Sequence, residues 1–105
     1  MMKLLSGVLA ATLAAMAAPA AMAADGAALA QKAGCMACHS IDKKMLGPSF
    51  KDIAAKYKGK DAEAALIKKV RDGGTGVWGA IPMPPNGNKL SDSEYKTVVS
   101  WILAQ

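Results

Sequence analysis

The sequence predicts a small all-α domain of about four helices, and three observations support this. Four segments after residue 23 place apolar side chains at helical spacing. Serine, aspartate and glycine stand at the ends of these segments, where helices typically begin and end. No segment alternates β-branched or aromatic residues over four or more positions, as a strand would.

Residues 1–23 have the pattern of a secretory signal peptide. Lys3 precedes an apolar run from Leu4 to Ala18, and Ala21-Met22-Ala23 provides the small residues of a cleavage site. We therefore expect cleavage of this segment and one mature domain over residues 24–105, exported to the periplasm. No second apolar run follows, which argues against an integral membrane protein.

The charge of the mature chain excludes one class of partner. Without Lys3, 12 basic and 8 acidic residues leave a net charge of +4. This charge is too small and too scattered along the sequence to indicate a nucleic-acid-binding protein.

The first two helices are expected on either side of a short connection. The first should begin at Asp25 as its N-cap and run into the segment Cys35–Cys38. The second should begin near Ser49 and end at Gly59. Its apolar stripe has spacing i, i+3, i+4 and i+7 and consists of Phe50, Ile53, Ala54 and Tyr57.

The last two helices are delimited by clearer signals. The third should be capped by Asp61 and stop at Gly73-Gly74, with Ala62, Ala65, Leu66 and Val70 facing inward. The fourth begins with a capping box at Ser91–Glu94, and Leu90 and Tyr95 occupy the positions of a hydrophobic staple. Its apolar stripe consists of Tyr95, Val98, Val99 and Ile102, with Trp101 beside it.

A loop is expected between the third and fourth helices. Residues 75–89 contain three of the five prolines of the chain, which exclude a helix. A loop of this length is uncommon in a compact domain and is usually functional or disordered; its apolar residues, among them Trp78 and Met83, favour a functional one. The glycines at 73, 74 and 76 follow a helix and lack a P-loop lysine, so they indicate a helix stop rather than a phosphate site.

The motif that carries chemistry is Cys35-Met36-Ala37-Cys38-His39, the Cys-x-x-Cys-His signature of c-type haem attachment. Residues three apart share a helix face, so both thiols can reach the two vinyl groups on one edge of a porphyrin. His39 can then turn its imidazole toward the iron. A covalent haem would also complete the core of a domain that is otherwise marginal in size.

Other interpretations of these residues have less support. A structural zinc site needs four Cys or His ligands, and the chain has two cysteines and one histidine. A thioredoxin-like dithiol lies near a βαβ pattern, and no strand is expected before Cys35. A Cys35–Cys38 disulfide would close too short a loop to stabilise the fold much. A redox dithiol or a plain disulfide, and a core role for His39, are the alternatives to haem.

The second axial ligand of the iron must come from elsewhere in the chain or be absent, because His39 is the only histidine. Met83 is the candidate: it follows His39 by 44 residues, and prolines on both sides hold its backbone extended. Met36 and Met45 lie too near the histidine in sequence to reach the opposite haem face. A methionine in a loop is often a gap filler, which is the alternative role for Met83.

The chain resembles the small bacterial class I cytochromes c of the cytochrome c-551/c-552 type over nearly the whole mature sequence. The attachment motif is generic to c-type haem, and the tryptophan and proline-methionine segments are more specific. The matching segments are Gly34–His39, Met45–Pro48, Gly76–Gly79, Ile81–Asn86 and Trp101–Leu103. The resemblance implies the class I cytochrome c fold, with about four helices wrapped around one covalent haem c.

The resemblance also implies roles for individual residues. His39 and Met83 would be the axial iron ligands, and the Pro48 carbonyl would accept the other imidazole N–H. Trp78 would donate its indole N–H to a haem propionate, and Asn86 would hydrogen-bond the Met83 sulfur. The passage from Asn86 to the last helix is slightly longer than usual in the family.

Basic residues have two possible uses. Lys69 and Arg71 are candidates to pair with the propionates, or they form a solvated helix end that complements the macrodipole. A second group forms either a docking surface for acidic partners or a solvated basic face. It consists of Lys32, Lys43, Lys44, Lys51, Lys56, Lys58 and Lys60.

The function expected from these observations is that of a soluble, monomeric one-electron carrier that is not an enzyme. Its partners would be membrane or periplasmic donor and acceptor proteins of the cytochrome oxidase, nitrite reductase or quinol-oxidising complex class. One alternative is a haem-based gas sensor or peroxidase-like protein in which Met83 is displaced. A more distant alternative is a thiol oxidoreductase without haem.

Overall fold

The computed structural model describes residues 17–105 and confirms the predicted all-α fold class. It contains α1 (Ala17–Lys32), the 3₁₀ helix η1 (Cys35–Ala37), α2 (Phe50–Tyr57), α3 (Glu63–Asp72) and α4 (Asp92–Leu103). Within the described range, β-pairing is limited to one isolated bridge between Gly74 and Met83. None of the described helices is long and apolar enough to span a membrane. Most of the predicted signal peptide lies outside the described residues.

The prediction that α1 begins at Asp25 is wrong. The helix begins at Ala17, so Asp25 lies within it. Residues 17–24 are mostly alanine, the strongest helix former, and the helix therefore continues through them without a cap at Asp25. The helix also ends at Lys32, before the cysteines, because Gly34 takes a left-handed φ of 78°. Cys35–Ala37 then form a separate tight turn.

α2 begins where the sequence predicts. The Ser49 side chain accepts the N–H of Asp52 at 3.1 Å, as an N-cap does. The helix ends at Tyr57, and Gly59 takes a φ of 71° in the turn that follows. Phe50 is the most deeply buried residue of this helix. α2 is thus anchored to the core at its first turn.

The predicted cap of α3 is also wrong. Asp61 has a φ of 50°, and Ala62 stands at the N-cap position with no side-chain hydrogen bond. Aspartate tolerates the left-handed region better than most residues, so Asp61 lies in the turn before α3 and does not cap the helix. The helix ends at Asp72, with Gly73 as its C-cap, as predicted.

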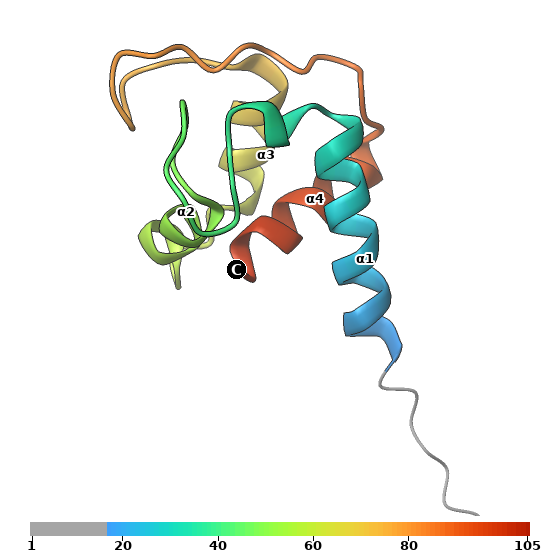
Figure 1. Cartoon of the computed structure of the whole chain (residues 1–105). Helices are drawn as coiled ribbons and strands as arrows, with labels where there is room; N and C mark the ends of the chain where they lie inside the picture. The colour runs from blue at the N-terminus through green and yellow to red at the C-terminus, as the bar shows by residue number, and fades with distance from the viewer. Residues whose placement is uncertain (1–16) are drawn as a thin grey trace, which may run out of the picture.

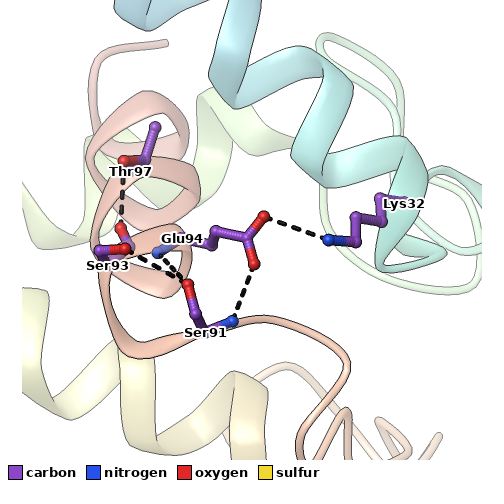
Figure 2. A network of polar contacts seen from close by, with 5 residues as sticks. All are labelled: Lys32, Ser91, Ser93, Glu94 and Thr97. Carbon is purple, nitrogen blue, oxygen red and sulfur yellow. Dashed lines mark hydrogen bonds and ion pairs between the residues drawn. The ribbon is translucent and has the colours of Figure 1, made fainter.

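α4 begins with the predicted capping box, which Figure 2 shows together with its neighbours. Ser91 Oγ accepts the N–H of Glu94, and the Glu94 carboxylate accepts the N–H of Ser91 at 2.9 Å. The same carboxylate pairs with Lys32 Nζ at 3.2 Å, from the end of α1 (Figure 2). The cap of α4 therefore also ties α4 to α1.

The core is built around α4, which packs against α1, α2 and α3 (Figure 1). Tyr95, Val98 and Val99 of α4 are almost fully buried, together with Phe50. Trp101 meets the Phe50 ring edge-on, with ring centroids 5.3 Å apart. The predicted apolar stripe of α4 is therefore the centre of the core.

The segment after α3 is irregular, as the prolines predict. It is the long orange trace that leaves α3 and returns to α4 in Figure 1. Gly74 and Met83 exchange two backbone hydrogen bonds at 3.0 and 2.8 Å, which form the isolated bridge. This bridge attaches the middle of the segment to the end of α3.

Candidate functional site

A cavity of about 320 Å³ lies between the cysteine motif, α2, α3 and the loop after α3. Its volume is in the range of small-molecule and cofactor sites, and most of its lining is apolar, as is usual for them. The apolar side chains that line it come from α2, α3, α4 and the loops before α2 and after α3, and include Leu46, Phe50, Ile53, Leu66, Val77, Ile81, Val99 and Ile102. Apolar side chains around a cavity of this kind exclude water from the group that binds there.

Both cysteines of the motif line this cavity. Cys35 and Cys38 are free thiols, and Cys35 is buried. Burial raises the pKa of the Cys35 thiol above its ordinary value, although a backbone hydrogen bond and the positive charge of Lys89 act in the opposite direction. The Cys35 sulfur is therefore held as a neutral thiol in the free protein.

His39 lines the same cavity and has a fixed orientation. Its Nδ1 lies 2.7 Å from the Pro48 carbonyl oxygen, the acceptor that the resemblance implies. The Phe50 ring stacks on the imidazole, with centroids 5.3 Å apart and planes inclined by 21°. Because the carbonyl can only accept, Nδ1 carries the proton and Nε2 has the lone pair that can bind a metal.

Met83 is half-buried and lines the cavity together with its neighbours Pro82 and Pro84. The other two methionines of the mature chain do not line it: Met36 is 37% exposed and Met45 is 48% exposed. The structure thus brings one methionine to the cavity that also holds the histidine.

Trp78 also lines the cavity and is partly exposed at 44%. The Nζ atom of Lys56 lies 5.2 Å from the centroid of its ring, a cation–π distance. Sequence reasoning assigned Lys56 only to the basic face. Lys56 stands next to Tyr57, which belongs to the apolar stripe of α2, and this is the only feature of the sequence that places Lys56 near the cavity and Trp78.

Of the two basic residues proposed near the propionates, only Lys69 lines the cavity. Arg71 points elsewhere: its guanidinium pairs with Asp92 at 2.6 Å and lies 4.7 Å from the centroid of the Tyr95 ring. Asn86 is not among the residues that line the cavity, and its backbone N–H donates to the Val70 carbonyl at 3.0 Å.

Two glycines at the site were not assigned a role there from the sequence. A Cβ atom on Gly47 would lie 2.5 Å from Cε1 of His39, so the ring packs directly on this backbone. Gly73 lies equally close to the backbone around Met83. Both contacts depend on the folded structure, and no local pattern in the sequence predicts them.

The residues at the cavity fit a c-type haem. Two thiols and an imidazole lie within five consecutive residues, a thioether lines the same cavity from another segment, and the wall is apolar. Across residues 17–105, no cluster of three or more His, Cys, Asp or Glu side chains could hold a metal ion alone. A haem can use this donor set, and a structural zinc site cannot.

Comparisons with known proteins find one matching family and several similar relatives. The cytochrome c family model matches residues 23–105. The chain is 50% identical over 86 residues to cytochrome c-551 of Pseudomonas aeruginosa, which covers 81% of each chain. It is 53% identical over 76 residues to cytochrome c-552 of Nitrosomonas europaea, which covers 71% of this chain and 73% of that one.

Solved structures have the same fold. The crystal structure of wild-type Nitrosomonas europaea cytochrome c552 matches with a TM-score of 0.70 at 52% identity, over 74% of this chain and 96% of that chain. The class 1 cytochrome MtoD of Sideroxydans lithotrophicus ES-1 matches with a TM-score of 0.66 at 36% identity, over 77% and 92% of the two chains.

Proposed function

Because the chain belongs to the cytochrome c family and takes a c-type haem, we propose that it is an exported one-electron carrier. The observation that carries the proposal is that Cys35, Cys38, His39 and Met83 line one and the same apolar cavity. An iron site with two protein ligands and an apolar wall has no position for a substrate. The protein therefore passes electrons between partners and is not an enzyme.

The bound haem supplies one iron that accepts and releases a single electron. Cys35 and Cys38 hold the haem covalently, and His39 binds the iron through Nε2 while the Pro48 carbonyl fixes its ring. Met83 provides the second ligand, and a thioether ligand raises the reduction potential. Trp78, which lines the cavity, donates its indole N–H to a haem propionate. Asn86 does not line the cavity, so its side chain must turn toward the Met83 sulfur to bond it when the haem is bound.

Two observations favour this function over its alternatives. The bridge between Gly74 and Met83 holds the methionine backbone, which disfavours a sensor or peroxidase whose methionine leaves the iron. The burial of Cys35 disfavours a thiol oxidoreductase that uses this sulfur as its nucleophile, because such a thiol must be accessible and have a lowered pKa, and burial raises the pKa of Cys35.

The cellular setting belongs to the same proposal. Residues 1–23 are cleaved as a signal peptide, and the mature protein works in the periplasm as a monomer. Its donor and acceptor are redox proteins of the cytochrome oxidase, nitrite reductase or quinol-oxidising complex class.

The ligand assignment is tested in protein matured by haem-attachment machinery. We expect Met83→Ala to abolish the sulfur-to-iron charge-transfer band of the ferric protein and to lower the reduction potential. Met45→Ala, at an exposed methionine, is the matched control and should change neither. A band that persists in Met83→Ala and disappears in Met45→Ala would overturn the assignment.

The carrier function itself is tested by ligand binding and electron exchange. Ferrous wild-type protein should be six-coordinate and low-spin without added ligand, its spectrum should not change under carbon monoxide, and it should exchange electrons reversibly with a soluble redox dye. A high-spin ferrous protein that binds carbon monoxide readily would instead indicate the sensor.

A further inference from the structure

The end of α3 lies directly against the backbone that carries Met83. Gly73 follows the helix, and its N–H donates to the Lys69 carbonyl at 2.7 Å, which closes the last turn. A Cβ atom at Gly73 would overlap the carbonyl oxygen of Met83 and lie 2.8 Å from the nitrogen of Pro85. Both neighbours are backbone atoms, which cannot turn away as the end of a side chain can. Only glycine allows the two backbones to meet at this spacing.

Four backbone hydrogen bonds attach the same loop to the end of α3. The N–H of Met83 donates to the Gly74 carbonyl at 2.8 Å, and the N–H of Gly74 donates to the Met83 carbonyl at 3.0 Å. The N–H groups of Asn86 and Gly87 donate to carbonyls in the last turn of α3, at 3.0 and 2.9 Å. The loop is therefore held at Met83 and again a few residues after it.

The loop has little freedom to move away from Gly73. Pro84 and Pro85 have a fixed φ, which limits how the backbone after Met83 can adjust. The hydroxyl of the buried Tyr95 donates to the Gly87 carbonyl and holds the end of the loop against α4. An atom added at Gly73 should therefore displace the backbone of Met83.

We infer that the end of α3, with Gly73 at the point of contact, positions the Met83 thioether. The missing side chain at Gly73 sets how close the Met83 backbone comes to α3, and hence how far the sulfur extends into the cavity. Gly73 is thus a positioning residue that acts through Met83. The inference rests on the proposed ligation of the iron by Met83.

The test compares Gly73→Ala with Gly59→Ala in the matured, haem-containing protein. The two glycines have nearly equal φ, 73° and 71°, but a Cβ at Gly59 meets nothing within 4 Å. The control therefore places an alanine at a positive φ without the contact. Gly73 also has a ψ of −167°, a region that essentially only glycine adopts, so backbone strain at the point of contact adds to the effect of Gly73→Ala. The measurement is the affinity of ferric protein for added imidazole, which competes with Met83 for the iron, together with the sulfur-to-iron charge-transfer band.

We expect Gly73→Ala to bind imidazole about tenfold more tightly than the wild type, because a ligand that is seated in fewer molecules competes less well. The charge-transfer band of Gly73→Ala should weaken at the same time. Gly59→Ala should keep the wild-type affinity and band, whatever its melting temperature. Equal imidazole affinities in Gly73→Ala and the wild type, or an equal increase in Gly59→Ala, would overturn the inference.

A second variant decides the matter if Gly73→Ala does not mature. Tyr95→Phe removes the hydroxyl that holds Gly87 and keeps the ring in the core, so we expect imidazole affinity to rise by a smaller factor. An unchanged affinity in that variant would overturn the inference. Failure of the proposed ligation is distinguishable, because the charge-transfer band would then persist in Met83→Ala.

Discussion

At the scale of single residues, the imidazole of His39 is oriented by residues outside the cysteine motif. The Pro48 carbonyl accepts its N–H, the Phe50 ring stacks on one face, and the Gly47 backbone lies against the ring edge. These neighbours fix both the tautomer and the direction of Nε2. The attachment motif contains the histidine, and residues 47–50 fix the orientation of its ring.

Replacement of Gly47 by alanine should disturb this geometry. The added Cβ would lie 2.5 Å from Cε1 and 2.8 Å from Nδ1 of His39, so the ring or the backbone must move. Overpacking of this kind costs about 1–3 kcal/mol of unfolding free energy. Denaturant unfolding of the matured protein measures this loss. A Gly47→Ala protein as stable as the wild type would contradict the close packing of the ring on this backbone.

At the scale of helices, the sequence predicted starts and stops where a local side chain determines them. Ser49 and Ser91 cap their helices as expected, because each hydroxyl accepts an N–H three residues ahead. Asp25 and Asp61 show the limit of this reasoning. The alanine-rich stretch before Asp25 continues the helix, and the backbone at Asp61 turns into the left-handed region.

The site was predictable to the extent that it is contiguous in sequence. Cys35, Cys38 and His39 form one motif, and prolines mark Met83, so the sequence indicates these four residues as candidates, and all four line the cavity. The direction of Arg71 and the contact of Gly73 with the Met83 backbone could not. Each depends on segments that meet only in the folded chain.

The cap of α4 gives α1 and α4 a pH-dependent link. Hydrogen bonding to the Ser91 backbone, and then to Lys32, lowers the pKa of Glu94 below its ordinary value of 4.5. A lowered folded-state pKa stabilises the protein above the ordinary pKa, and this stabilisation is lost as the pH falls through the folded-state value. Glu94 is partly exposed and pairs with a largely exposed lysine, so solvent screens the charge and the effect should be small.

Glu94→Gln isolates this charge, because glutamine can still accept the Ser91 N–H in a capping box. We expect the variant to be less stable than the wild type at pH 6 and equally stable once the pH is well below 4.5. Urea unfolding of both proteins at a series of pH values checks this. A stability difference that is constant over the series would show that the carboxylate charge contributes nothing.

At the scale of the whole molecule, the net charge of the mature chain is confined to one region. Residues 40–60 hold six lysines and two aspartates, whereas the rest of residues 24–105 hold six basic and six acidic residues. The net +4 therefore lies on α2, the loop before it and the turn after it. Phe50, Ile53 and Tyr57 of this region line the cavity, while the loop 75–88 on the other side carries no charge.

This asymmetry predicts that anionic redox partners approach from the side of α2. Steering by a charged surface raises association rates and weakens with added salt.

The probe is oxidation of the ferrous protein by hexacyanoferrate(III), an anion, at low ionic strength. We expect Lys51→Glu/Lys58→Glu to slow this reaction more than Lys68→Glu/Lys96→Glu, at two exposed lysines that do not line the cavity, although both double variants change the net charge equally. The difference should disappear at high salt and reverse in sign with a cationic cobalt(III) oxidant. Equal slowing by the two double variants would mean that only the total charge matters, and that the lysines near α2 form a solvated face with no role in docking.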